Sequence, residues 1–201
     1  LEDDRERTLR HVSHELKTPL TALKEGVALL DEEVPAPLAG AQREVVDILA
    51  HNVSSLQAQI ESLLSLNAAA FEARRLNLGP TPLNRLLQAV VRQRELHIQS
   101  RHLKVVVEAP AVQAILDAEK MKAMLDNLLS NAIDFSPDHG EIRLSVQRDG
   151  PNWRFECVDQ GPGIAEEDAE RIFEPFVQGQ RQAPAPRQGS GVGLSIVREL
   201  A

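Results

Sequence analysis

Aromatic residues, cysteine and long apolar runs are all scarce in this sequence of 201 residues. Aromatic residues make up 3% of it, so a core must be built from aliphatic side chains, and that balance favours helical packing. The single cysteine, Cys157, has no partner for an internal disulfide, which fits a reducing compartment. No stretch approaches the ~20 apolar residues of a membrane span, and no signal peptide is recognisable.

Positive charge is also in short supply. The formal net charge is −8, and no run of Lys or Arg stands out, so we expect no nucleic-acid partner. What the chain does have is 42% apolar residues, enough for a hydrophobic core. Its length allows one large domain or two modest ones.

The first third of the chain has the pattern of two long helices. Apolar residues recur every three or four positions over residues 3–33 and again over 41–74, as on one face of a helix. Residues 34–40 contain two prolines and a glycine and are typical of a turn, so the two helices form an antiparallel hairpin. One hairpin cannot cover both apolar stripes. We therefore expect a homodimer with a four-helix bundle; the alternative is that the rest of the chain covers the stripe.

A boundary follows at residues 78–82, after which the pattern becomes mixed α/β. We predict domains at 1–76 and 77–201. In the second domain, helices are expected over 83–99, over 118–135 and from 191 onward. Strands are expected over 103–108, 113–116, 141–147 and 153–158, the last two joined as a hairpin. Residues 177–188 are expected to be a mobile loop.

The first candidate site is a histidine near the start of the chain. On a helical wheel His14 lies roughly 160° from the centre of the apolar stripe, so it faces solvent. A neutral imidazole is a nucleophile at pH 7. Glu15 can accept the hydrogen bond of the other ring nitrogen. Thr18, one turn along on the same face, can position a water, and Pro19 is expected to kink the helix.

Other interpretations of this histidine exist. An isolated His-Glu pair is usually no more than two surface residues. His11 lies on the same outer face, so a two-histidine metal site is conceivable, although no third ligand is in view.

The second candidate site consists of four short blocks in the mixed α/β part. Asn127 and Asn131 lie one turn apart on a predicted helix, where amide oxygens suit Mg²⁺ and amide N–H groups suit phosphate. The other three blocks are Asp159-Gln160-Gly161-Pro162-Gly163, Phe173-Glu174-Pro175-Phe176 and Gly189-Ser190-Gly191-Val192-Gly193-Leu194. Glycines allow close approach of backbone to a ligand, and the last block opens a helix whose N–H groups can hold phosphates.

Together these motifs carry a resemblance that covers almost the whole chain. The string from His14 to Leu20, His-Glu-Leu-Lys-Thr-Pro-Leu, resembles the phosphoacceptor motif of sensor histidine kinases of two-component systems. The four later blocks resemble, in order and approximate spacing, the ATP-binding domain of the same family. That domain is an α/β sandwich shared with gyrase, Hsp90 and MutL-type ATPases.

The resemblance implies an ATP- and Mg²⁺-dependent protein-histidine kinase that passes its phosphoryl group to an aspartate on a response regulator receiver domain. It implies His14 as phosphoacceptor, Glu15 as catalytic base and Thr18 as the water-positioning residue of a phosphatase reaction. In the ATP site it implies Asn131 as Mg²⁺ ligand, Asn127 at the phosphates and Asp159 at the adenine. The glycine blocks complete the nucleotide site, and residues 177–188 become the lid. The nucleotide-site residues of those blocks are Gly161, Gly163, Gly189, Gly191, Gly193 and Leu194.

The sequence departs from the family pattern at three places. Relatives commonly carry Lys and Tyr where this chain has Asp134 and Phe135, and we expect Asp134 to turn outward or to approach Mg²⁺. Many relatives carry Arg where this chain has Gln178; Arg181 or Arg187 is one replacement for that charge, and solvated loop charges are the other interpretation. The family domain usually continues with two more strands after the point where this sequence ends, at Ala201.

These departures leave two rival hypotheses open. One is a non-catalytic or phosphatase-only module, and the other is a chaperone-like or topoisomerase-like ATPase. The resemblance also implies that the chain is the cytoplasmic portion of a bacterial inner-membrane protein, attached only through segments upstream.

Overall fold

The computed structural model describes residues 19–34, 37–72, 75–177, 179 and 191–201. The chain divides into two compact units, residues 1–68 and 69–201. Each unit is described by itself, and the predicted domain boundary between residues 76 and 77 stays a prediction. Among the described residues, no helix combines the length and the hydropathy needed to cross a bilayer.

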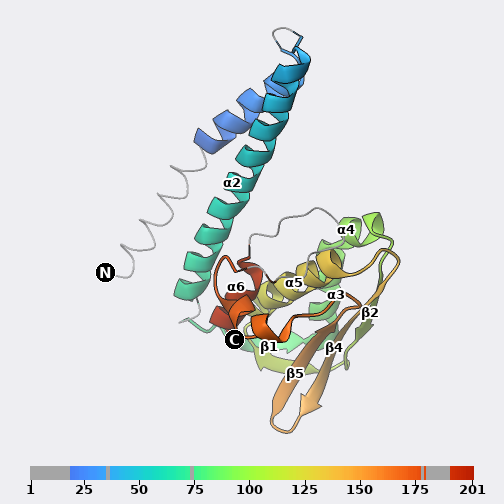
Figure 1. Cartoon of the computed structure of the whole chain (residues 1–201). Coiled ribbons are helices and arrows are strands. Elements are labelled where there is room, and N and C mark those ends of the chain that lie inside the picture. The colour runs from blue at the N-terminus through green and yellow to red at the C-terminus, as the bar shows by residue number, and fades with distance from the viewer. Residues whose placement is uncertain (1–18, 35–36, 73–74, 178, 180–190) are drawn as a thin grey trace. The chain divides into compact units, whose positions relative to one another are not determined.

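The first unit is helical, as predicted. A helix covers residues 19–31, and α2 covers Gly40–Glu72, so the predicted turn separates them (Figure 1). In the described residues of this unit, Leu20 and Val46 are buried. Most of the described large apolar side chains of the unit are exposed instead: Leu23, Leu29, Leu30, Val34, Val45, Ile48, Leu49 and Leu56. A single chain therefore leaves the predicted apolar stripe largely open to water.

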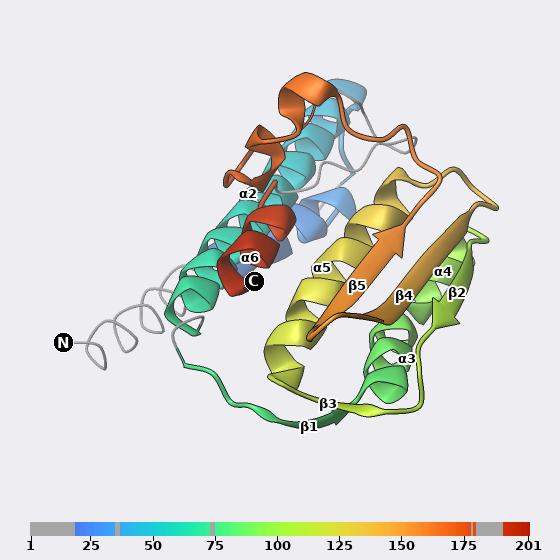
Figure 2. The ribbon, with the colours of Figure 1, turned by 90° about the horizontal axis from the view of Figure 1, so that it is seen from below.

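The second unit is an α/β sandwich built on two small sheets. In the described residues, the larger sheet has the order β2-β4-β5, formed by Lys104–Glu108, Glu141–Asp149 and Asn152–Val158. Strand β2 runs parallel to β4, and β4 and β5 form the predicted antiparallel hairpin. Helices α3 (Leu83–Gln93), α4 (Glu95–Ser100) and α5 (Ala118–Phe135) pack with this sheet, and α6 covers Gly193–Leu200 (Figures 1 and 2).

The core lies between α3, α5 and one face of the sheet. Buried residues recur at helical spacing on α5, where Leu125, Leu129 and Ile133 are at most 1% exposed. On β4 every second side chain is buried, as expected for a strand with one face on the core. The opposing registers Leu144↔Cys157 and Val146↔Phe155 place apolar pairs on that same face.

Two local predictions were incomplete. Residues 79–82, interpreted as a boundary, form β1 (Gly79–Pro82), which pairs antiparallel with β3 (Gln113–Leu116). The predicted helix over 83–99 is broken at Arg94 into α3 and α4. Two short 3-10 helices, Glu166–Asp168 and Arg171–Phe173, lie between β5 and α6.

The burial of α5 gives a first prediction. Replacing Leu129, which is 0% exposed, by alanine should lower the free energy of unfolding of the second unit by about 2–5 kcal/mol, because the cavity cannot fully collapse. Leu96 is 84% exposed, so Leu96→Ala should stay within about 0.5 kcal/mol of the parent. Urea titration followed by circular dichroism measures both, and equal losses for the two variants would contradict this core.

The second prediction concerns Cys157 on β5. Burial, with a smaller contribution from the charge of Asp159, raises the pKa of the Cys157 thiol to about 11. Because the thiolate is the reactive form, alkylation by iodoacetamide at pH 8 should be roughly a hundredfold slower in the folded chain than in the same chain in guanidinium chloride. Mass spectrometry follows the reaction, and similar rates in the two states would show that the thiol is accessible.

Candidate functional site

Helix α5 holds both predicted asparagines, on one face and one turn apart. Its side-chain cap is Asp117, which accepts a hydrogen bond from the Lys120 amide at 3.2 Å. The opposite face carries Leu125 and Leu129 into the core, so the packing that holds the helix also fixes the direction of its polar face. Asn127 and Asn131 are both partly buried at this face.

The Asn127 amide is oriented by two neighbours. Its Nδ2 group donates to the Ala123 carbonyl at 2.9 Å, one turn back along the helix. Its Oδ1 atom faces the start of α6, where a Cβ added to Gly193 would lie 3.0 Å away. The glycine thus lets the first turn of α6 come close to α5, so that the N-terminal end of one helix and the amide of the other share one space.

Asp159 follows β5 and lies in a tight turn with Gly161. Its Oδ1 atom accepts the Gly161 N–H at 2.7 Å, and the carboxylate is exposed. A Cβ on Gly161 would lie 2.7 Å from the carbonyl oxygen of Phe135, the last residue of α5. Because Gly161 has no side chain, the turn can approach the end of α5 closely, and this approach places Asp159 beside that end.

Gln160 fastens the same turn to the sheet. Its Oε1 atom accepts the Glu141 N–H at 2.9 Å, at the first residue of β4. The turn around Asp159 is thereby held on two sides, by the sheet and by the end of α5.

The glycine-rich block and the phenylalanine block also meet. The Phe176 N–H donates to the Gly191 carbonyl at 2.9 Å. Gly191 has φ +70°, and a Cβ there would come within 2.9 Å of the backbone at Phe176 and Val177. Only glycine fits this left-handed, crowded position without strain, so the hydrogen bond fixes both ends of the intervening segment.

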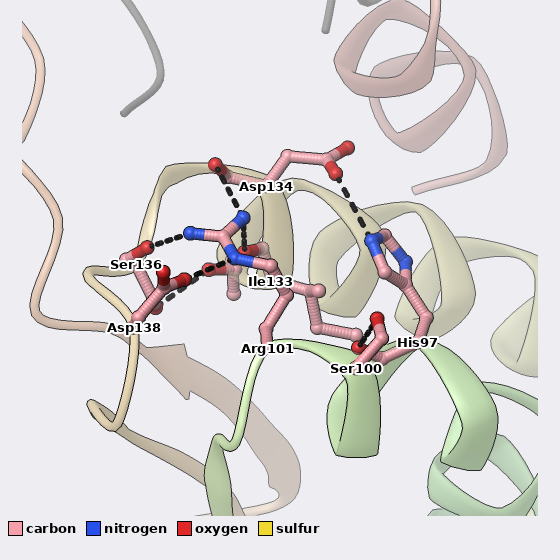
Figure 3. A network of polar contacts seen from close by, with 8 residues as sticks. His97, Ser100, Arg101, Ile133, Asp134, Ser136 and Asp138 are labelled. Carbon is pink, nitrogen blue, oxygen red and sulfur yellow. Dashed lines mark hydrogen bonds and ion pairs between the residues drawn. The ribbon is translucent and has the colours of Figure 1, made fainter. Parts of the chain in front are cut away.

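The far end of α5 is held by Arg101, from the turn after α4 (Figure 3). Its guanidinium donates to the carbonyl oxygens of Ile133 and Ser136, at 3.3 and 2.7 Å. It also donates to the Asp138 carboxylate at 2.5 Å and holds the pKa of that carboxyl below its usual range. A cation at carbonyls that the helix cannot pair itself stabilises the helix end, which is the end that Gly161 contacts.

The side chain of Asp134 points toward α4, which the sequence did not predict. Its Oδ1 atom lies 3.6 Å from the Nε2 atom of His97 on α4, and both side chains are largely buried, at 27% and 18% exposed (Figure 3). The expected outward turn of Asp134 is therefore wrong, because its side chain is partly buried against α4; its expected approach to Mg²⁺ stays a prediction. No motif or periodicity indicates the contact with His97, since 37 residues separate the partners.

Part of the predicted site lies outside the described residues. His14, Glu15, Thr18, Gly189, Gln178, Arg181 and Arg187 are among those positions, as is most of the predicted lid. Of the others, Asn127, Asn131, Gly193 and Leu194 come from α5 and α6, and Asp159 and Gly161 come from the turn after β5. Gly163 lies further along that turn with φ +71°.

Two family descriptions match this chain. Residues 4–69 match the His Kinase A (phospho-acceptor) domain. Residues 116–201 match the family described as histidine kinase-, DNA gyrase B-, and HSP90-like ATPase.

Similar proteins carry matching names. The chain is 36% identical over 203 residues to the sensor histidine kinase GlrK of Escherichia coli, covering 99% of this chain and 42% of that protein. It is 31% identical over 207 residues to the sensor-like histidine kinase SenX3 of Mycobacterium tuberculosis, covering 100% of this chain and 49% of that protein. The chain thus spans less than half the length of these two relatives.

Solved structures of similar fold agree. Full-length ShkA in complex with AMPPNP is 27% identical with a TM-score of 0.68, covering 96% of this chain and 40% of that one. The catalytic domain of histidine kinase ThkA is 28% identical with a TM-score of 0.54, covering 62% of this chain and 79% of that one.

The close approach at Gly161 gives the third prediction. Gly161→Ala should lower the free energy of unfolding of the second unit by about 1–3 kcal/mol, because the new methyl group would meet the Phe135 backbone as well as the Asp159 carboxylate, and the backbone cannot move aside easily. Gly79→Ala is the matched control, since nothing lies within 4 Å of a Cβ built there. Thermal melting compares the two, and a Gly161→Ala variant as stable as the control would refute the packing of this turn.

Proposed function

Because the chain belongs to the sensor histidine kinases of two-component systems, we propose that its second unit binds ATP and that the γ-phosphoryl group is transferred to His14. One observation carries the nucleotide site. Two sequence blocks, far apart in the chain, converge on helix α5: Gly193 lies against Asn127, and Gly161 lies against the Phe135 carbonyl. That convergence is what an ATP site needs, since Asn127 and Phe135 lie about 12 Å apart along the helix axis, a distance that an extended nucleotide can span between its adenine and its phosphates.

Each residue of this cluster has a proposed task. Asn127 contacts the phosphates, together with the backbone N–H groups of Gly191, Gly193 and Leu194 at the start of α6. Asp159 accepts a hydrogen bond from the adenine amino group, a role that its exposed carboxylate allows. Gly161 and Gly163 let the backbone approach the base, and Gly189 is assigned to the same phosphate-binding block.

The residues present also fit Mg²⁺. Among the described residues, no group of three or more His, Cys, Asp and Glu side chains is placed to hold a metal ion. Asn131 offers an amide oxygen, a hard neutral ligand, and the phosphate oxygens of the nucleotide are the natural remaining ligands. When bound, Mg²⁺ would supply neutralisation of the charge on the transferred phosphoryl group.

The acceptor chemistry follows from the His14 motif. The neutral imidazole forms an N–P bond as the bond from phosphorus to the leaving ADP oxygen breaks. Glu15 holds the other ring nitrogen by hydrogen bonding and accepts its proton as positive charge develops on the ring. The phosphoryl group then passes to an aspartate on a response regulator receiver domain, and Thr18 positions water for the reverse, phosphatase reaction.

The assembly is proposed to be a homodimer. Its support is the exposed apolar face of α2, where Val45, Ile48 and Leu49 are 42–60% exposed in the single chain; pairing two such faces would form a four-helix bundle. The chain would work at the cytoplasmic side of a bacterial inner membrane, joined to it through segments beyond these 201 residues.

The unusual Asp134 is compatible with catalysis. A carboxylate near the phosphates would repel them, by about 1 kcal/mol at 4 Å in bulk water and ~4 kcal/mol at an effective dielectric of 20. Its Oδ1 atom instead lies 3.6 Å from Nε2 of His97, a group that carries the opposite charge when protonated. This contact supports the kinase proposal, because it gives the carboxylate a neighbour other than the phosphates.

The fourth prediction tests the phosphoacceptor. With labelled ATP and Mg²⁺, the chain should acquire an acid-labile label, because an N–P bond hydrolyses readily in acid. His14→Ala should take up less than about 1% of that label, since no other nucleophile occupies its place. His11→Ala, altered on the same helical face, is the matched control and should label normally.

Gel autoradiography before and after acid treatment gives the answer. Undiminished labelling of His14→Ala would overturn the site. Release of inorganic phosphate without any protein-bound label would favour the chaperone-like or topoisomerase-like ATPase.

A further inference from the structure

A buried lysine lies in the first turn of α5, outside the residues assigned to nucleotide. Lys120 is 7% exposed, and lysines are almost never buried this far unless their ammonium group is paired. Its Nζ atom donates to the carbonyl oxygen of Arg75, 45 residues earlier in the chain. The same Nζ atom lies 3.6 Å from the Asp117 Oδ2 atom.

Asp117 makes a second contact with the same stretch of chain. While Oδ1 caps α5, Oδ2 accepts the backbone N–H of Asn77 at 2.9 Å. The Asp117 side chain is only 9% exposed. The Asn77 N–H and, to a lesser degree, Lys120 hold the pKa of this carboxyl below its usual range, so the carboxylate remains charged and paired at neutral pH.

The contacted stretch is the connection between helix α2 and strand β1, within the second unit. Helix α2 ends at Glu72 and β1 begins at Gly79, so residues 75–77 lie between them. They are held by side chains of α5, the helix that also carries Asn127 and Asn131. Hydrogen bonds to charged groups, shielded from water, are the strong kind.

We propose that Asp117 and Lys120 are positioning residues that clamp residues 75–77 to the first turn of α5 and thereby set the length of the tether between the histidine-bearing helices and the nucleotide site. This inference rests on the proposed function for its kinetic consequence. The clamp itself stands on the contacts above.

The length of this tether should decide how often the nucleotide site meets the His14-bearing helices productively. With the clamp closed, two residues, 73 and 74, separate Glu72 from Arg75; with it open, six residues, 73–78, separate Glu72 from β1. The effective concentration that a tether provides falls roughly as the −3/2 power of its length, so lengthening it from two to six residues should reduce that concentration about fivefold.

The first experiment tests the clamp through the rate of tryptic cleavage and requires no kinase activity. Lys120→Met keeps the length and apolar stem of the side chain but removes the donor to the Arg75 carbonyl. Trypsin must capture that same carbonyl to cut the Arg75–Leu76 bond, so the variant should yield the fragment that begins at Leu76 at least about fivefold faster than the parent, judged by mass spectrometry. Lys122→Met, two residues along α5, is the control and should cut at the parent rate.

The second experiment tests the effect of the clamp on nucleotide affinity and on the rate of His14 labelling. Lys120→Met should bind a fluorescent ATP analogue with the parent Kd, because Lys120 lies about 10 Å along the helix from Asn127, while the rate of His14 labelling falls about fivefold. A merely structural role would weaken both. Asp117→Asn, which still caps the helix, should show the same pattern to a smaller degree and replaces Lys120→Met if that variant fails to fold.

Each outcome decides a separate point. Unchanged tryptic cleavage in both variants overturns the clamp. Faster cleavage with an unchanged rate of His14 labelling shows that the clamp exists but contradicts its proposed role in setting the tether length. A parent chain that takes no label contradicts the proposed function instead, and the tryptic comparison still decides the clamp.

Discussion

Helix α5 packs one face into the hydrophobic core and presents the opposite, polar face to the candidate nucleotide site. The other elements of that site depend on this orientation. The buried leucines of α5 pack against the sheet. This packing fixes the rotation of the helix about its axis, so the side-chain amides of Asn127 and Asn131 face away from the core. Its first turn is capped by Asp117 and its last carbonyls are held by Arg101, so neither end frays. The blocks that contain Gly161 and Gly193 are placed by contact with this one rigid element.

Much of this could be predicted from the sequence. The bounds of α5 and of the β4–β5 hairpin follow closely from apolar periodicity, because strong amphipathic patterns outweigh local uncertainty. The order of the glycine blocks identified the family, and the convergence of those blocks on one helix is consistent with that identification.

What could not be predicted depends on partners distant in sequence. Strand β1 was missed because Gly79 and its two prolines are typical of a turn, yet Pro80 and Pro82 are tolerated where β1 pairs with β3 alone. Arg94, where the predicted helix breaks, makes a bidentate ion pair with Asp126 on α5, at 2.5 and 2.7 Å. The periodicity of apolar residues in the sequence predicts neither this ion pair nor the contact of Asp134 with His97.

The hydrogen bond from Phe176 to Gly191 has a consequence for how such chains can diverge. It joins positions 176 and 191 to each other, so the chain leaves and re-enters the described structure at neighbouring points. The entropic cost of closing a chain segment rises only slowly, by about 0.6 kcal/mol for each doubling of its length. Segments of different length and charge can therefore be accommodated between these two positions without moving the backbone that the hydrogen bond joins.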